Sequence, residues 1–167
     1  MLVEFVDMTN TSTVSDTIGA AVKAVRTRHG WTQADLAAQC ASIGAPHLTA
    51  AVIYDIESGR RDAAGRRRRE ISTDEWLALA LALDAAPVHL AVPLEDSDTC
   101  QLTDTVSEQA GLVRQWVRGV HPLGGTDRRV YYMFVPEADL RRGEQLAQLI
   151  DVGLIEVITG REEEEDS

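Results

Sequence analysis

Arginine is concentrated in one short stretch of this sequence, "GRRDAAGRRRREIS", residues 59–72. Between Arg60 and Arg69 it holds six of the 16 basic residues of the chain. A guanidinium group presents several N–H donors in a planar fork that fits a phosphate, and arginine is also favoured in narrow, A·T-rich minor grooves of DNA. The stretch therefore predicts a phosphate clamp or a minor-groove arm. The alternative is a solvated basic loop that pairs with the acidic second half of the chain.

The charge of the chain is distributed unevenly. The formal net charge is -11, but residues 17–91 contain nine basic and eight acidic residues, whereas residues 92–167 contain seven basic and 16 acidic ones. Basic character is thus local, and an acidic whole-chain pI of about 4.7 does not exclude binding to nucleic acid.

Helical patterns fill residues 17–91, the part that contains the arginine stretch. Apolar residues recur there at the spacing of amphipathic helices, and two capping boxes, Thr32 with Asp35 and Ser72 with Glu75, mark helix starts. The predicted N-caps are Ser15 or Asp16, Thr32, Thr49 or a neighbour, and Ser72. The predicted helix ends are Gly30, Gly44 or Pro46, and Gly59. With a short helix opened by Pro87, the pattern predicts five helices in a compact all-α unit.

Three motifs within this unit resemble one family of DNA-binding proteins. They are "GWTQADLAAQC" at 30–40, "VIYDIESGRR" at 52–61 and "STDEWLALALAL" at 72–83. Together they resemble the helix-turn-helix domain of the Cro/C1-type (XRE) regulators, in the form frequent in actinobacteria and their phages. The resemblance covers about residues 17–91. It implies a second and a third helix that form a helix-turn-helix unit, with the third helix in the major groove of double-stranded DNA.

The resemblance also implies roles for individual residues. Gln33 is expected to bind a phosphate or a base edge, Ala37 to permit close approach of two helices, and Glu57 and Gly59 to serve the end of the third helix. The predicted DNA-binding residues are Thr32, Gln33, His47, Thr49, Ala50, Ala51, Tyr54, Arg60, Arg61, Arg66, Arg67, Arg68 and Arg69.

Two departures from the family pattern affect this prediction. The turn "SIGAPHLT" at 42–49 is longer than usual, and "TAAV" at 49–52 offers methyl groups where relatives often have hydrogen-bonding side chains. Alanine can contact a thymine methyl group but makes no bidentate hydrogen bonds to bases.

The second half of the sequence predicts a small α+β domain. Residues 1–16 are expected to form an N-terminal segment, 92–104 a linker, 105–160 the α+β domain and 161–167 an acidic disordered tail. Within the domain, the pattern predicts a helix over 105–118, a strand "RRVYYMFV" at 128–135, a helix from Pro136 and a strand "LIEVIT" at 154–159. Such a domain would serve homodimerisation, added DNA contact or an effector pocket.

Other classes of function are disfavoured. The four histidines have no metal-ligand spacing, no nucleophile or phosphate-loop motif occurs, and no apolar run is long enough for a membrane span. We therefore expect no enzyme activity, no cofactor, no metal, no membrane association and a cytoplasmic location. The predicted function is a sequence-specific transcriptional regulator, a repressor such as a phage immunity repressor. The alternative is an antitoxin-like protein-interaction module with autoregulatory DNA binding.

Overall fold

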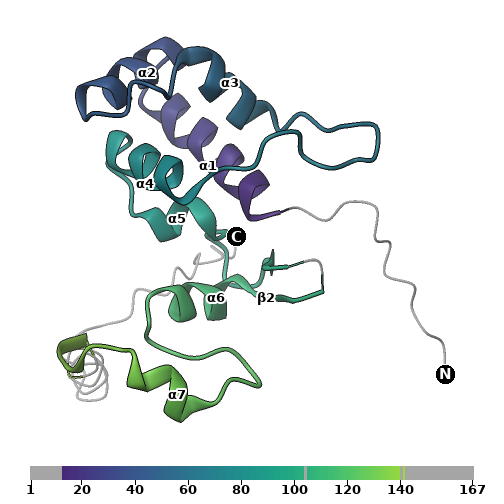
Figure 1. The fold of residues 1–167 in the computed structure, drawn as a ribbon, viewed down its shortest axis with the longest axis vertical. Coiled ribbons are helices and arrows are strands. Elements are labelled where there is room, and N and C mark those ends of the chain that lie inside the picture. The colour runs from purple at the N-terminus through teal and green to yellow at the C-terminus, as the bar shows by residue number, and fades with distance from the viewer. Residues whose placement is uncertain (1–12, 104, 140, 142–167) are drawn as a thin grey trace, which may run out of the picture. The chain divides into compact units, whose positions relative to one another are not determined.

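The computed structural model describes residues 13–103, 105–139 and 141, and it divides into two compact units after Arg118 (Figure 1). The first unit begins with five helices, as predicted. They are α1 (Val14–Arg28), α2 (Gln33–Ser42), α3 (Ala50–Ser58), α4 (Thr73–Ala82) and α5 (Pro87–Ala91). A two-stranded hairpin and a further helix follow, so the described chain is mainly helical at its start and mixed α+β as a whole.

Capping interactions explain where these helices begin and end. The predicted boxes of Thr32 with Asp35 and Ser72 with Glu75 are both present, which confirms the starts of α2 and α4. Gly59 adopts the left-handed conformation with φ of 56°, which ends α3 where the sequence predicted. The predicted cap of α1 was wrong, because Thr13 is the N-cap and Asp16 completes a third capping box from inside the helix.

The core of the first unit lies between its packed helices. α1 packs against α3 and α5, and α2 packs against α3 and α4. Leu36, Ile53 and Leu79 are fully buried there. At Gly19 the α1 backbone approaches α3 so closely that an added Cβ atom would lie 2.4 Å from the carbonyl oxygen of Ile56. A side chain at this position would therefore push the two helices apart.

The hairpin differs from the sequence prediction for this region. β1 (Thr99–Gln101) pairs antiparallel with β2 (Ser107–Gln109), with Cys100 opposite Glu108, and α6 (Ala110–Val117) follows directly. The segment 92–104, predicted as a linker, thus contains a strand, and the helix predicted over 105–118 begins only at Ala110. The backbone of residues 107–109 pairs with β1 instead of forming a helix. The Ala110 N–H donates a hydrogen bond of 2.8 Å to the backbone carbonyl oxygen of Asp98. Cys100, Ala110 and Val113 join the buried core formed by α1–α5.

The described part of the second unit contains α7 (Arg128–Met133), where the sequence predicted a strand. That prediction was wrong although the segment is rich in aromatic and β-branched residues. The Asp127 side chain accepts hydrogen bonds from the backbone N–H groups of Arg129 and Val130 and so caps a helix. Residues 137–139 and 141 are helical. The rest of the helix predicted from Pro136, the strand predicted at 154–159 and the acidic tail lie outside the described residues.

Candidate nucleic-acid interface

The helices α1, α2 and α3 are held together at one buried carboxylate, that of Glu57. Arg26, near the end of α1, donates through Nε to Glu57 Oε1 at 2.6 Å and through a terminal nitrogen to Oε2 at 2.9 Å. The side chains of Arg26 and Glu57 are only 9% and 4% exposed. Gln33, in the first turn of α2, donates to the same Oε2 at 3.1 Å. One carboxylate therefore fixes the end of α1, the start of α2 and the end of α3 relative to one another.

Arg26 was not identified from the sequence, although a signal for it exists. Ile18, Val22 and Arg26 follow each other at intervals of four, and the first two are buried. A cation on a buried helical stripe requires an anionic partner. The hydrogen bonds to Glu57 raise the pKa of Arg26, although burial alone would lower it. Glu57, expected to serve the end of α3, is that partner.

Several predicted DNA-binding residues have structural contacts of their own. Thr32 and Thr49 are the N-caps of α2 and α3, and each side-chain oxygen accepts a hydrogen bond from its own helix. Gln33 is half-buried and donates to Glu57, as described above. These side chains therefore position the starts of the two helices.

The exposed residues of α3 include Asp55 and Ser58, but its first four residues, 50–53, have no hydrogen-bonding side chain. Ala51 and Tyr54 are exposed, Ala50 is half-buried, and His47 is exposed in the turn before the helix. The guanidinium carbon of Arg60 lies 5.2 Å from the centre of the Tyr54 ring, within the range of a cation–π contact. A nitrogen of Arg60 lies 3.5 Å from the Tyr54 hydroxyl. Tyr54 and Arg60 thus form a pair on the surface beside the two alanines.

Residues 60–70, which we call the arginine loop, fold back as a small hairpin. Arg61 and Arg67 form a β-bridge, and the Arg68 N–H donates to the Arg60 carbonyl at 2.8 Å. The turn is closed by Asp62, whose carboxylate accepts from the backbone N–H groups of Ala64 and Arg66. Because successive side chains of an extended segment point to opposite sides, consecutive arginines in 66–69 have opposite environments.

Arg67 and Arg69 face the protein. The Arg67 side chain is 4% exposed and forms an ion pair of 2.7 Å with Asp16. It also donates to the backbone carbonyl oxygens of Ile56 and Arg69. Arg69 pairs with Glu75, the capping residue of α4. Both arginines therefore hold the loop onto α1, α3 and α4, and Arg67 has no surface to offer a phosphate.

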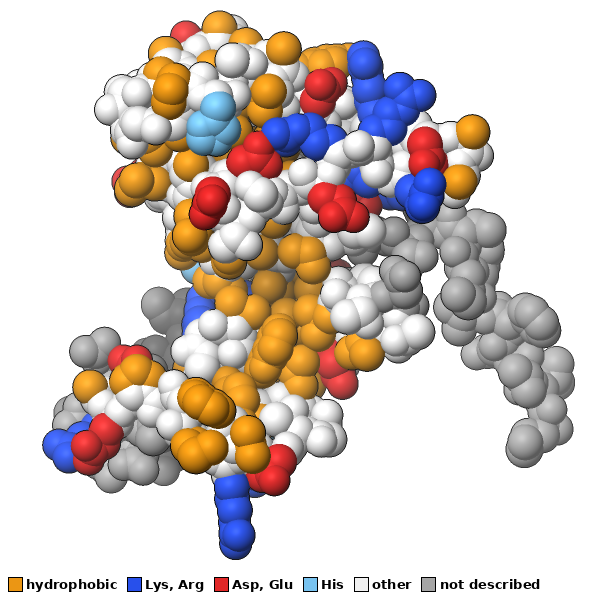
Figure 2. Space-filling model, viewed as in Figure 1, with side chains coloured by type: hydrophobic (Ala, Val, Ile, Leu, Met, Phe, Trp, Pro, Cys, Tyr) orange, Lys and Arg blue, Asp and Glu red, His pale blue; other side chains and the backbone are white. Residues whose placement is uncertain are grey.

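Arg61 has an intermediate position, because it pairs with Asp16 at 2.9 Å while its side chain stays 38% exposed. Arg66 and Arg68 point outward. Arg66 is 81% exposed and its ion pair, with Asp62 at 3.2 Å, is a surface pair; Arg68 is exposed as well. Figure 2 shows Lys and Arg side chains gathered at the edge of the helical region that the loop forms, with acidic side chains among them. The outward cations beside α3 are thus Arg60, Arg66 and Arg68.

The carboxylates that anchor the loop stay ionised to low pH. Burial alone would raise the pKa of Asp16, but hydrogen bonds from the Thr13 backbone and from Arg67, with the charge of Arg61, hold this pKa below its ordinary value. Burial alone would likewise raise the pKa of Glu75, but hydrogen bonds from the Ser72 backbone N–H and from Arg69 lower it below its ordinary value. The loop is therefore held by charged pairs at neutral pH.

Comparison of the chain with protein-family models, curated proteins and solved structures finds no match. In the part of the chain that the structure describes, His, Cys, Asp and Glu side chains do not gather in threes as metal ligands would. The same part has no helix whose length and hydropathy suit a membrane crossing.

Proposed function

We propose that this protein is a sequence-specific double-stranded DNA-binding transcriptional regulator, a repressor of the Cro/C1 (XRE) type. In this proposal α2 and α3 form the helix-turn-helix unit and α3 enters the major groove. The observation that supports it best is that Gln33 of α2 and Arg26 of α1 both donate to the Glu57 carboxylate of α3, whose outward face adjoins the exposed arginines. A clamped pair of helices presents a rigid surface, as base recognition requires.

The proposed contacts divide into two groups. Arg66 and Arg68 bind phosphates, and the first-turn N–H groups of α2 add the partial positive charge of a helix N-terminus. Ala50, Ala51 and Tyr54 face the base edges, where methyl groups suit thymine. Arg60 is the strongest hydrogen-bond donor next to these residues, and its contact with Tyr54 restricts where its guanidinium can lie. We therefore assign base discrimination mainly to Tyr54 and Arg60, and to Arg67 a purely structural role.

Selection of bound sequences from random duplex DNA, with the full-length chain, tests this proposal. We expect enrichment of a defined site and an affinity that falls steeply with salt, because bound cations are released from the phosphates. A palindromic site would indicate a symmetric homodimer, and an asymmetric one a monomer on its site.

A variant pair ties the binding to α3. Ala51→Glu places a negative charge on the exposed face of α3 with little effect on helix propensity. We expect it to weaken binding to all duplexes by about tenfold or more, since the charge would face phosphates and base acceptors. Ala20→Glu, at an exposed alanine of α1, is the control. Equal affinities of the two variants and the wild type, or no enriched site in the selection, would refute the proposal.

A further inference from the structure

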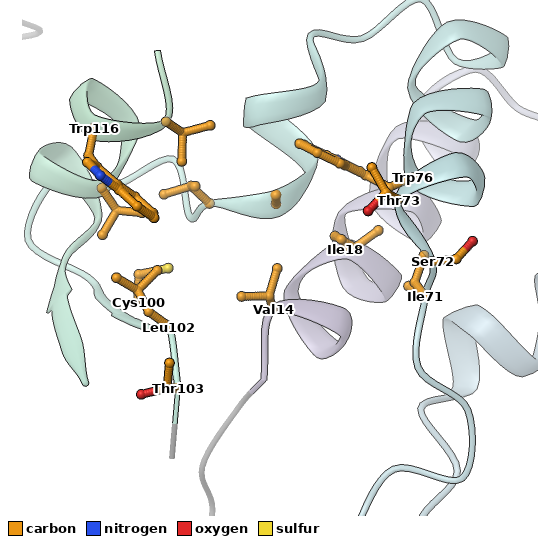
Figure 3. Close-up of a pocket in the computed structure, with 14 residues that line it drawn as sticks. Val14, Ile18, Ile71, Ser72, Thr73, Trp76, Cys100, Leu102, Thr103 and Trp116 are labelled. Carbon is orange, nitrogen blue, oxygen red and sulfur yellow. The ribbon is translucent and has the colours of Figure 1, made fainter. Parts of the chain in front are cut away.

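An apolar pocket lies inside the first unit, between the helices and the hairpin (Figure 3). Its volume is about 380 Å³. Trp76 of α4 and Ile18 of α1 form part of one side, and Cys100, Leu102 and Trp116 of the hairpin and α6 form part of the other. This volume lies within the range of small-molecule sites, which are concave and mainly lined by apolar and aromatic side chains.

The lining of the pocket disfavours a charged ligand. None of the 14 residues around it carries a formal charge, so a charged ligand would lose its hydration without gaining an ionic partner. The indole N–H of Trp76 already donates to the Pro87 carbonyl at 2.9 Å. The Ser72 hydroxyl accepts from the Glu75 N–H as a helix cap. Few hydrogen-bonding groups therefore remain for a ligand.

The residues that line the pocket are close in the chain to those that anchor the arginine loop. Ile71, Ser72 and Thr73 line it and directly follow that loop in the chain. The Ile71 N–H donates to the Ser15 hydroxyl of α1 at 3.1 Å. Val14 lines the pocket two residues before Asp16, which holds Arg61 and Arg67. A molecule in the pocket would thus contact the chain next to Asp16 and directly after the arginine loop, on the two sides of the contact that positions this loop.

From these observations we infer that the pocket binds an uncharged, largely apolar small molecule, and that its occupancy changes DNA affinity by shifting the arginine loop. The second half of this inference rests on the proposed function. The first half concerns the pocket alone and is tested without DNA.

Two dyes with the same aromatic skeleton test the chemistry of the site. N-phenylnaphthylamine is neutral, whereas anilinonaphthalene sulfonate carries one negative charge. We expect the neutral dye to bind the full-length protein with a stoichiometry of one, detected by its own fluorescence and by energy transfer from tryptophan. The sulfonate should bind about tenfold or more weakly, because the lining offers no cation.

Two variants on α6 locate the site. Val117 lines the pocket and is 42% exposed, whereas Leu112, on the same helix, is 39% exposed and does not line it. Val117→Trp should fill the pocket and weaken binding of the neutral dye at least about tenfold, while Leu112→Trp should leave it unchanged. Thermal unfolding of both variants verifies that they are folded. No saturable binding of the neutral dye, preference for the sulfonate, or equal binding by the two variants would overturn the site.

Regulation is tested by duplex binding in the presence of the neutral dye. We expect the saturated wild type to show a DNA affinity changed by about threefold or more, in line with ordinary coupling between two sites, and Val117→Trp to show no response. An unchanged affinity with the dye bound would overturn the coupling and leave the site standing. If the protein bound no duplex at all, the proposed function would fail, and the dye measurements would still decide the pocket.

Discussion

Asp16 and Arg67 form an ion pair of 2.7 Å although 51 positions separate them in the chain. Asp16 also completes the capping box of Thr13 at the start of α1 and pairs with Arg61. The Asp16 carboxylate thus joins the first turn of α1 to both arms of the arginine loop, one containing Arg61 and the other Arg67. Because Arg67 is almost fully buried, this contact decides the conformation of the loop and therefore where the exposed arginines lie.

Replacement of the buried arginine should cost stability. Arg67→Met keeps much of the side-chain length but removes the charge, so that Asp16 keeps Arg61 and Thr13 as partners but loses its buried cation, and the Ile56 carbonyl loses the donation from Arg67. We expect the free energy of unfolding to fall by about 2–4 kcal/mol, measured by chemical denaturation. The matched control is Arg68→Met, at an exposed neighbour. A loss of stability in Arg68→Met as large as that in Arg67→Met would contradict the assignment of Arg67 as the anchor.

Replacement of the outward arginines should act on DNA binding instead. The double variant Arg66→Ala, Arg68→Ala should keep wild-type stability, because surface pairs contribute little. It should weaken binding to all duplexes and lower the slope of log affinity against log salt by about 2, one for each phosphate contact. Fluorescence anisotropy over a range of salt concentrations measures both quantities.

The control for that variant is Arg128→Ala, Arg129→Ala, which removes the same charge from exposed positions of α7. This control should lower the slope of log affinity against log salt by less than the Arg66→Ala, Arg68→Ala variant does. Equal losses in the two double variants would show that net charge, and not the arginine loop, governs the affinity.

Acid should remove the contribution of Asp16. The pKa of this carboxyl in the folded protein lies below the ordinary value of 3.8, so its stabilisation is fully present above that pH and is lost as pH falls through the folded pKa. Asp16→Asn lacks this contribution at every pH. The difference in unfolding free energy between wild type and Asp16→Asn should therefore be constant near neutral pH and shrink below about 3.8.

Glu70→Gln is the control for this titration, since Glu70 is an exposed carboxylate at the end of the arginine loop. Denaturation curves at a series of pH values supply the data for both variants. If the difference for Asp16→Asn grew toward acid pH, the sign of the linkage would be wrong and the ion pair would not stabilise the fold.

The close approach of α1 and α3 should make Gly19 intolerant of substitution. Alanine would normally stabilise a helix relative to glycine, but at this position its Cβ would meet the Ile56 carbonyl oxygen, which is backbone and cannot rotate away. We expect Gly19→Ala to destabilise the protein by about 1–3 kcal/mol, measured by thermal unfolding. Gly124→Ala, where an added Cβ meets nothing within 4 Å, should be neutral. A gain of stability in Gly19→Ala would mean that the helices are not in contact there.

The five helices were predictable from the sequence because their signals are local. A capping box joins residues three apart, and the buried stripe of a helix repeats every three or four positions. The same signals were insufficient at 128–133, where β-type residues form α7, because Asp127 caps a helix. They were also insufficient at 99–109, where β2 pairs with β1 through residues 107–109, which the helical pattern had claimed.

The sequence alone also determined that cations gather beside the third helix, since charge and chain order place them there. Only the tertiary structure decided that Arg67 and Arg69 turn inward while Arg66 and Arg68 turn outward, and that Arg26 meets Glu57 across 31 positions. The physical reason is that adjacent arginines are chemically identical, and their environments differ only when a fold brings Asp16 and Glu75 to one side of the loop. The same holds for the apolar pocket, whose walls come from segments that contact one another only after folding.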